Sequence, residues 1–375
     1  MSFDKVEIGK VCDVGRGSSP RPIDNSAYFI GGTIPWIKIA DATASGKYIY
    51  QTKEVVNEFG ASFSRLLQPG ALIIATSGVS LGQIKFLGVE GCIHDGWLYV
   101  NNFRGVDKEF LYYHLLTMQE EFLGRAYGAA IQNINTTILR ESKINLPPLP
   151  TQRKIASILS GYDDLIENNL KRIKLLEEKA SLMFKLMQKD LSDAEKINLY
   201  DFADIQMGFA FKAEAFNEEG EGIPIIRIRD IPSQLTKSYT TQEVDNQYWI
   251  EKGDLLIGMD GEFHMNEWLG QRGYLVQRVC RLRTKNELYQ SYLWQSLKEP
   301  IHYYETTISG ATVAHLGKKH LEEIFIAQPK ELMKSELVEL NTMRKLKIVL
   351  AEQNTKLREA RNILLPKLMN GQIEV

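Results

Sequence analysis

The sequence has little of what exported, membrane-spanning or metal-binding proteins need. Only three cysteines occur in 375 residues, and Cys12, Cys92 and Cys280 form no CxxC pair. No stretch approaches the ~18 apolar residues of a membrane-spanning helix, and the start, MSFDKVEIGK, lacks the apolar core of a signal peptide. We therefore expect a cytoplasmic protein with reduced thiols.

Catalytic signatures are missing as well. There is no GxxxxGK[ST] phosphate loop, and the lone GxG in VGRGSS is more typical of a turn than of a nucleotide site. The histidines form no HExxH motif, and His94 beside Asp95 has no nucleophile nearby in the sequence. LPPLP lacks the Asn and the aromatic residue of the amino-methyltransferase loop. We expect a non-catalytic binding protein with no metal and no cofactor of its own.

The net charge of −2 does not by itself indicate a nucleic-acid partner. A basic face can nevertheless be balanced by acidic helices elsewhere. The stretch QRGYLVQRVCRLRTK carries Arg272, Arg278, Arg281, Arg283 and Lys285 without a carboxylate. It predicts either a basic strand pair on an open surface or part of a nucleic-acid contact.

The most informative feature is an internal repeat. IPWIKIAD (Ile34–Asp41) recurs as IPIIRIRD (Ile223–Asp230), and QPGALIIATSG (Gln68–Gly78) recurs as EKGDLLIGMDG (Glu251–Gly261). Likewise GAAIQNI recurs as GATVAHL about 182 residues later. Each copy has short β-type runs, then a stretch of helical period, then a last strand. We therefore expect two α+β domains, each followed by a helix.

The helix that closes each copy has a coiled-coil pattern. Its seam residues are spaced alternately by four and three. The first helix places Ile155, Leu159, Tyr162, Ile166, Asn169, Ile173, Leu176, Ala180, Met183 and Met187 at these positions, and the second places Leu346, Leu350, Gln353, Leu357, Ala360, Leu364 and Leu368. A lone helix cannot bury such a narrow stripe. We expect the two helices to pack antiparallel, with Asn169 and Gln353 as polar seam residues, and to form a stiff spacer of about 60 Å.

Together these blocks resemble the specificity subunits of type I restriction–modification systems. The blocks are GRGSSP, GGTIPWIKIAD, QPGALIIATSGVSLGQI, AIQNIN, KRIKLLEEK, the terminal LLPKLMNGQIEV and, most specifically, LPPLPTQRKIASIL before a heptad helix. The resemblance implies an α+β fold with two tandem pseudo-repeated target-recognition domains, each a small sheet plus helices, separated by two long antiparallel coiled-coil helices. It places the first domain at 1–147, the first helix at 148–192, the second domain at 193–329 and the second helix at 330–375.

The resemblance also implies partners. Each domain would read one half of a bipartite double-stranded DNA target, and the helices would bind two methyltransferase subunits, on which motor/nuclease subunits dock. S-adenosylmethionine, ATP and Mg²⁺ would belong to those partners. Charged residues on the outer helix faces are either docking residues or solvated flanks: Arg172, Lys174, Glu177, Lys179, Lys356, Arg358 and Arg361.

Candidate DNA contacts are polar and basic residues of the loops, because amides, guanidiniums and hydroxyls read base edges while Lys and Arg bind phosphates. In the first domain they are Arg16, Ser18, Ser19, Arg21, Lys38, Ser77, Ser80, Gln83, Lys85, His94, Gln132, Asn133 and Asn135. In the second they are Lys212, Arg227, Arg229, Asp260, His264, Arg272, Arg278, His315, Lys318 and Lys319. Two alternatives to a DNA reader stay open: a coiled-coil scaffold that binds only proteins, and a catalytic methyltransferase or nuclease.

Overall fold

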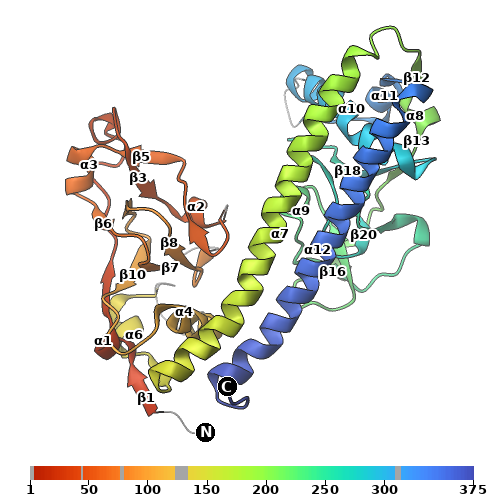
Figure 1. Ribbon diagram of the computed structural model, residues 1–375. Coiled ribbons are helices and arrows are strands. Elements are labelled where there is room, and N and C mark those ends of the chain that lie inside the picture. Colours follow the sequence, from red (N-terminus) through yellow and green to blue (C-terminus); the bar gives the residue numbers. More distant parts are fainter. Residues whose placement is uncertain (1–3, 44, 77–79, 123–133, 309–313) are drawn as a thin grey trace. The chain divides into compact units, whose positions relative to one another are not determined.

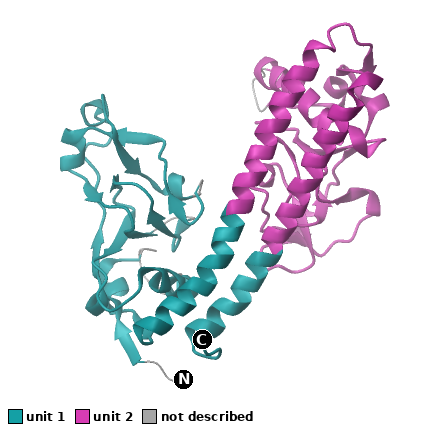
Figure 2. Ribbon diagram, viewed as in Figure 1, with its two compact units in different colours: residues 1–167, 356–375 teal, residues 168–355 magenta. Residues whose placement is uncertain are grey.

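The computed structural model describes residues 4–43, 45–76, 80–122, 134–308 and 314–375 (Figure 1). The chain divides into two compact units, residues 1–167 with 356–375 and residues 168–355 (Figure 2). Both combine small sheets, short helices and segments of two long helices, so the predicted α+β fold is confirmed. Among the described residues, none of the helices has the apolar length needed to cross a membrane.

The described residues of the first unit form three small sheets rather than one. The central sheet has the order β2 (Asp13–Arg16), β10 (Trp97–Asn101), β7 (Leu72–Ala75), β8 (Ile84–Leu87) and β4 (Tyr48–Ile49). The second has the order β5 (Glu54–Val56), β3 (Ile34–Ile37), β9 (Gly91–Ile93) and β6 (Arg65–Leu67), and a ribbon pairs β1 (Asp4–Glu7) with β11 (Lys143–Leu146). Among the described residues, the helices of its globular part include α1 (Ile8–Val11), η1 (Ser26–Tyr28), α2 (Ile39–Thr43), α3 (Glu58–Ser62), α4 (Lys108–Thr117) and α6 (Thr136–Glu141).

The second unit repeats this plan. Its central sheet has the order β13 (Ala203–Met207), β21 (Val279–Thr284), β18 (Leu255–Gly258) and β19 (Met265–Glu267). The other sheet has the order β14 (Phe216–Asn217), β16 (Tyr239–Thr240), β15 (Ile223–Ile226), β20 (Gly273–Leu275) and β17 (Trp249–Ile250), and a ribbon pairs β12 (Lys196–Asn198) with β22 (Phe325–Ala327). Its helices are α8 (Leu199–Phe202), η3 (Ala213–Ala215), α9 (Asp230–Ser233), η4 (Asn246–Tyr248), η5 (Glu287–Tyr289), α10 (Gln290–Thr307), α11 (Lys318–Glu322) and η6 (Glu331–Met333).

The repeat is visible in single backbone hydrogen bonds. At the end of β2, the Gly17 N–H donates to Trp97 O at 2.8 Å, and at the end of β13 the Gly208 N–H donates to Val279 O at 3.0 Å. Four further hydrogen-bonded pairs of the first unit have an equivalent pair in the second. The first-unit pairs are Ile8–Ser142, Lys38–Asp41, Gly70–Leu87 and Thr76–Gly96, and their equivalents are, in the same order, Leu199–Ile324, Arg227–Asp230, Gly253–Trp268 and Met259–Arg278. Both halves of the chain therefore build the same backbone frame from different side chains.

Two long helices complete the units, α7 (Leu149–Lys189) and α12 (Lys334–Met369). Asn169 contacts Asn354, and Glu177 contacts Lys347. The contact further along α7 is therefore made by a residue earlier in α12, which shows that the two helices are antiparallel. The domain cores continue into them, since Ile155 and Leu368 belong to the same cluster as Phe110.

The seam largely follows the predicted spacing. Its buried members are Ile155, Leu159, Ile166, Asn169, Ile173, Ala180, Met187, Leu350 and Leu368, and its half-buried members are Tyr162, Leu176, Met183, Leu357, Ala360 and Leu364. Leu346 and Gln353, however, are exposed, although Gln353 Oε1 still accepts from Asn169 Nδ2 at 3.4 Å. Their neighbours Lys347 and Asn354 are buried in their place. The stripe on α12 is shifted because this helix also packs against the second domain, where the Lys347 ammonium lies 2.7 Å from the Glu267 carboxylate.

Candidate nucleic-acid interface

In the first unit, a polar site forms at the turn between β9 and β10. Arg21 pairs with the Asp95 carboxylate, Arg16 Nε donates to Asp95 O at 2.8 Å, and Ser19 Oγ accepts the Asp95 N–H at 3.2 Å. Asp95 thus gathers the last residue of β2, Arg16, and two candidate residues of the loop that follows it, Ser19 and Arg21. Arg16 and Arg21 are exposed, so their guanidinium groups remain accessible from solvent.

A close backbone approach positions this loop. A Cβ atom on Gly17 would overlap the carbonyl group of His94, and one on Gly208 would overlap that of Val276. Glycine is therefore required where the first strand of each central sheet meets the neighbouring turn. Ser18 follows directly, and its N–H donates to the carbonyl of the last β9 residue at 3.2 Å.

His94 lies within the same site. Its Nδ1 lies 2.9 Å from the Gly96 backbone nitrogen and 2.9 Å from Asp95 Oδ1. Burial is the main cause that lowers the pKa of His94; Asp95 opposes it, and the cations Lys38, Arg21 and Arg16 add to it. The site therefore presents a neutral imidazole beside basic side chains at neutral pH. Lys38 lies 4.6 Å from the centre of the Trp36 ring and pairs with Glu54 at 2.5 Å.

Other first-unit candidates are held by contacts within the unit. Lys85 Nζ donates to the carbonyls of Ser45 and Gly46 at 2.8 and 2.7 Å, and burial lowers its pKa. Ser80 is buried, Gln83 is half-buried, and Asn135 Oδ1 caps α6 by accepting an N–H at 2.8 Å. Ser77, Gln132 and Asn133 lie outside the described residues.

In the second unit, the equivalent turn between β20 and β21 carries Arg278. Its Nε lies 3.3 Å from Asp260 Oδ2, and His315 Nδ1 lies 2.5 Å from Asp260 Oδ1. Asp260 and His315 also pair through their backbones in an isolated antiparallel bridge. The structure therefore brings together three candidates that the sequence separates by up to 55 residues.

The remaining second-unit candidates are dispersed. Lys212 and Lys319 are exposed. Arg227 contacts Ser238, Arg229 lies 4.0 Å from Glu218, His264 lies 3.3 Å from Glu262, and Lys318 lies 3.6 Å from Glu322.

The basic stretch 271–285 is not an open basic surface. Arg281 is buried and donates to Trp249 O, and Arg283 binds both oxygens of Asp254 at 2.5 and 2.7 Å. Arg272 pairs with Glu251 at 2.7 Å and stacks 3.9 Å from the Trp249 ring centre. The prediction of an open surface failed because acidic partners from other strands cannot be seen in a contiguous stretch of sequence.

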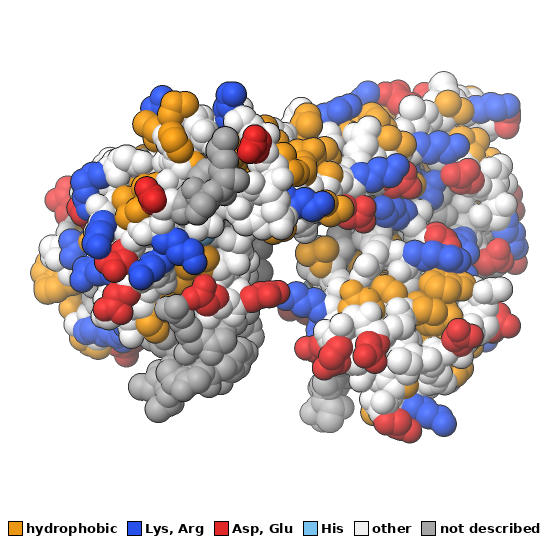
Figure 3. All heavy atoms as spheres, turned by 90° about the horizontal axis from the view of Figure 1, so that it is seen from below, with side chains coloured by type: hydrophobic (Ala, Val, Ile, Leu, Met, Phe, Trp, Pro, Cys, Tyr) orange, Lys and Arg blue, Asp and Glu red, His pale blue; other side chains and the backbone are white. Residues whose placement is uncertain are grey.

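Charge of both signs is present on the face drawn in Figure 3. On this face, Lys and Arg side chains are interspersed with Asp and Glu in both units. A DNA contact on such a surface depends on particular side chains rather than on a field of one sign. The described residues include no group of three or more His, Cys, Asp and Glu side chains that could hold a metal ion.

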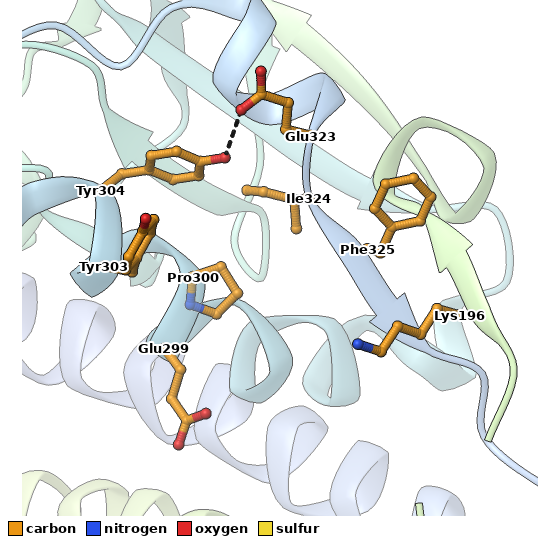
Figure 4. A pocket seen from close by; sticks show the side chains of 8 residues that line it. All are labelled: Lys196, Glu299, Pro300, Tyr303, Tyr304, Glu323, Ile324 and Phe325. Atoms are coloured by element: carbon orange, nitrogen blue, oxygen red, sulfur yellow. Dashed lines mark hydrogen bonds between the residues drawn. The ribbon is translucent and has the colours of Figure 1, made fainter. Parts of the chain in front are cut away.

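A cavity of about 690 Å³ in the second unit differs in kind from these sites (Figure 4). It is lined by Lys196, Glu299, Pro300, Tyr303, Tyr304, Glu323, Ile324 and Phe325. The Tyr304 hydroxyl points at Glu323 and donates to its carboxylate at 3.3 Å. Aromatic walls with two carboxylates suit an apolar or cationic side chain and oppose phosphate, and none of the DNA-contact candidates lines this cavity.

The two polar turns lie on a backbone frame that is used twice, and known proteins share this plan. The family model for the type I restriction modification DNA specificity domain matches residues 2–178 and 192–333. The chain belongs to this family. It is similar over its whole length to the MjaIX specificity subunit of Methanocaldococcus jannaschii, with 23% identity and 94% of that protein covered.

Two further relatives of the specificity-subunit family bear on this chain. The EcoBI specificity subunit of Escherichia coli is 32% identical over 135 residues, which are 36% of this chain and 28% of that protein. The crystal structure of the type I restriction–modification S subunit from M. genitalium aligns with a TM-score of 0.54 at 20% identity, covering 98% of this chain and 96% of that one. At this identity the structural likeness shows the fold.

Proposed function

We propose that this chain is the DNA-reading subunit of a type I restriction–modification assembly, in which each domain reads one half of a bipartite double-stranded target. The observation that carries the proposal is that both domains have the same backbone fold but different polar side chains at the equivalent turns. At the β9–β10 turn, Arg16 and Arg21 contact Asp95 next to His94, whereas at the β20–β21 turn Arg278 shares Asp260 with His315. Two domains that read different base sequences need the same scaffold and different side chains on it.

The long helices would set the gap between the two half-sequences. α7 has 41 residues and α12 has 36, and a helix of about 40 residues rises about 60 Å. Asn169 Nδ2 donates to Asn354 Oδ1 at 3.0 Å, and both residues are buried. A buried amide pair of this kind fixes the register of packed helices, because sliding would leave both groups without partners.

The helices would also bind the two methyltransferase subunits. An apolar stripe on α7 is exposed: Leu165, Leu175, Leu182 and Leu186 have exposed fractions of 54 to 63%. Exposed apolar surface of this extent on a helix is typical of an interaction site. The charged residues proposed for docking are less well supported than this apolar stripe, because Glu177, Lys179 and Arg361 already form ion pairs with residues of the same chain.

The chemistry would reside in the partners. Methyl transfer with S-adenosylmethionine would belong to the methyltransferase subunits, and ATP-driven cleavage with Mg²⁺ to motor/nuclease subunits that dock on the same complex. This chain would act in the cytoplasm without catalysing a reaction itself. Its three cysteines are buried and unpaired, which suits that compartment.

The test is to purify the chain with its methyltransferase partner and to map methylated adenines by single-molecule sequencing. We expect one bipartite sequence with a fixed gap. Exchange of residues 1–145 for the corresponding part of another family member should replace one half-sequence only. Binding of the complex to DNA without sequence selectivity would instead support the protein-scaffold alternative.

A further inference from the structure

We infer that Arg278 reads a guanine in the half-sequence bound by the second domain, and that Asp260 positions Arg278 together with His315. The inference rests on the proposed function, because it names a base that this domain would recognise.

The backbone at Arg278 is unusual. Arg278 has a φ of +70°, at the third position of a turn that the Val279 N–H closes onto Val276 O at 3.1 Å. Glycine or asparagine normally fills this turn position, because a Cβ disfavours positive φ. A long side chain in a disfavoured conformation is typical of functional sites, where the surrounding structure enforces the strain. Here the Met259 N–H holds Arg278 O at 2.8 Å.

The guanidinium group is held at one edge. Asp260 Oδ2 lies 3.3 Å from Nε, and 55% of the Arg278 side chain is exposed. Within the described ranges, no contact to either terminal nitrogen of Arg278 is present. Those two nitrogens form the fork that matches O6 and N7 of guanine in the major groove, the commonest specific pairing between a side chain and a base.

His315 is fixed by the same carboxylate. A carboxylate can only accept, so the 2.5 Å contact with Asp260 places the imidazole proton on Nδ1. The His315 side chain is 46% accessible. The Gly261 N–H donates to Ala314 O at 2.9 Å and holds this segment against the end of β18. Both side chains are therefore ordered before DNA binds, which lowers the entropy cost of recognition.

The charge balance favours a base edge over a phosphate. Asp260 neutralises Arg278, and its carboxylate repels a phosphate brought to the same place. A guanine edge is uncharged and requires a correctly oriented fork instead. The neighbouring arginines cannot take this role, because Arg281 and Arg283 are tied to Trp249 and Asp254.

The experiment uses the complex of the full chain with its methyltransferase partner. Binding is measured for duplexes that carry each of the four base pairs at each position of the second half-sequence. The variants are Arg278→Ala, Arg278→Lys and Asp260→Asn. Lys237→Ala is the matched control, since it removes an exposed positive charge from the same unit.

We expect the unmodified complex to prefer guanine at one position by about tenfold to a hundredfold. Arg278→Ala and Arg278→Lys should abolish that preference, Asp260→Asn should weaken it, and Lys237→Ala should leave it unchanged. Preferences at the other positions of the second half-sequence should persist in every variant and show that the second domain is folded. A uniform loss of affinity for all duplexes, with a smaller salt dependence, would make Arg278 a phosphate contact and overturn the inference. An unchanged preference would overturn it too, whereas an unmodified complex without sequence selectivity would refute the proposed function itself.

Discussion

Replacing Glu267 by Gln should destabilise the second unit by about 3 kcal/mol. Glu267 ends β19, and its carboxylate lies 2.7 Å from Arg344 Nε and 2.7 Å from Lys347 Nζ, all within a buried cluster. Removing one partner of a buried ion pair costs about 3–5 kcal/mol, because the remaining charges stay in a medium of low dielectric constant. Arg344 keeps Glu287 at 3.1 Å and Lys347 keeps Glu177 at 3.3 Å, which places the expected cost at the lower end.

Urea unfolding followed by tryptophan emission measures this loss, because three of the five tryptophans, Trp249, Trp268 and Trp294, belong to the second unit. The matched control is Glu339→Gln, which breaks the exposed Lys179–Glu339 pair in the same unit. That change should cost less than about 1 kcal/mol, since solvent screens exposed ion pairs. If the unfolding midpoints of the two variants shift equally, the buried ion pairs of Glu267 stabilise the second unit no more than an exposed ion pair does, which would contradict the prediction.

Further predictions concern the spacer, the docking stripe and the response to acid. Deleting one heptad from each long helix should change the gap between the methylated half-sequences and leave the half-sequences alone; an unchanged gap would contradict the spacer role. Leu182→Asp should weaken methyltransferase binding, measured by calorimetry, without lowering the urea midpoint of the free chain, because this leucine is 63% exposed. Burial lowers the pKa of His114 from 6.5 to about 4, and its Nε2 accepts the Asn145 N–H at 2.9 Å. As the pH falls, His114 is therefore protonated in the unfolded chain before it is protonated in the folded one. The free energy of unfolding of the first unit should decrease by about 3 kcal/mol between pH 6.5 and pH 4. Urea midpoints measured over this pH range should show the decrease, and the His114→Gln variant should show less of it.

The sequence was sufficient for the repeat and for most of the seam, because both depend on local spacing. The shift at Leu346 could not be predicted in this way. A pattern of apolar and polar residues places Lys347 on the exposed face of the helix. Its ammonium group nevertheless lies 4.3 Å from the Trp294 ring centre and pairs with Glu267. A long side chain with an apolar stem can fill a buried position when a distant residue supplies the counter-charge. Only the tertiary structure shows that counter-charge.

The candidate sites show the same limit. Arg16 and Arg21 could be predicted from their Gly-rich loop, but their meeting with Asp95 depends on strand pairing across more than 70 residues. Lys85 also looked accessible in sequence, because nothing local indicates that two backbone carbonyls hold its ammonium. Residue type and loop position predict which side chains can bind DNA. The fold determines which of them are already engaged.

Each recognition domain is attached to the long helices through a buried carboxylate, although the residues differ between the repeats. In the first unit, Asp163 of α7 accepts the Tyr113 hydroxyl at 2.5 Å and pairs with Arg361 of α12. In the second unit, Glu267 of the domain pairs with two cations of α12. Breaking either contact would bury an unpaired charge, so each domain is held in one orientation on its own helix segments. A helical spacer can define a gap in DNA only if both domains are held in this way, because a domain free to pivot would accept several gaps whatever the helix length.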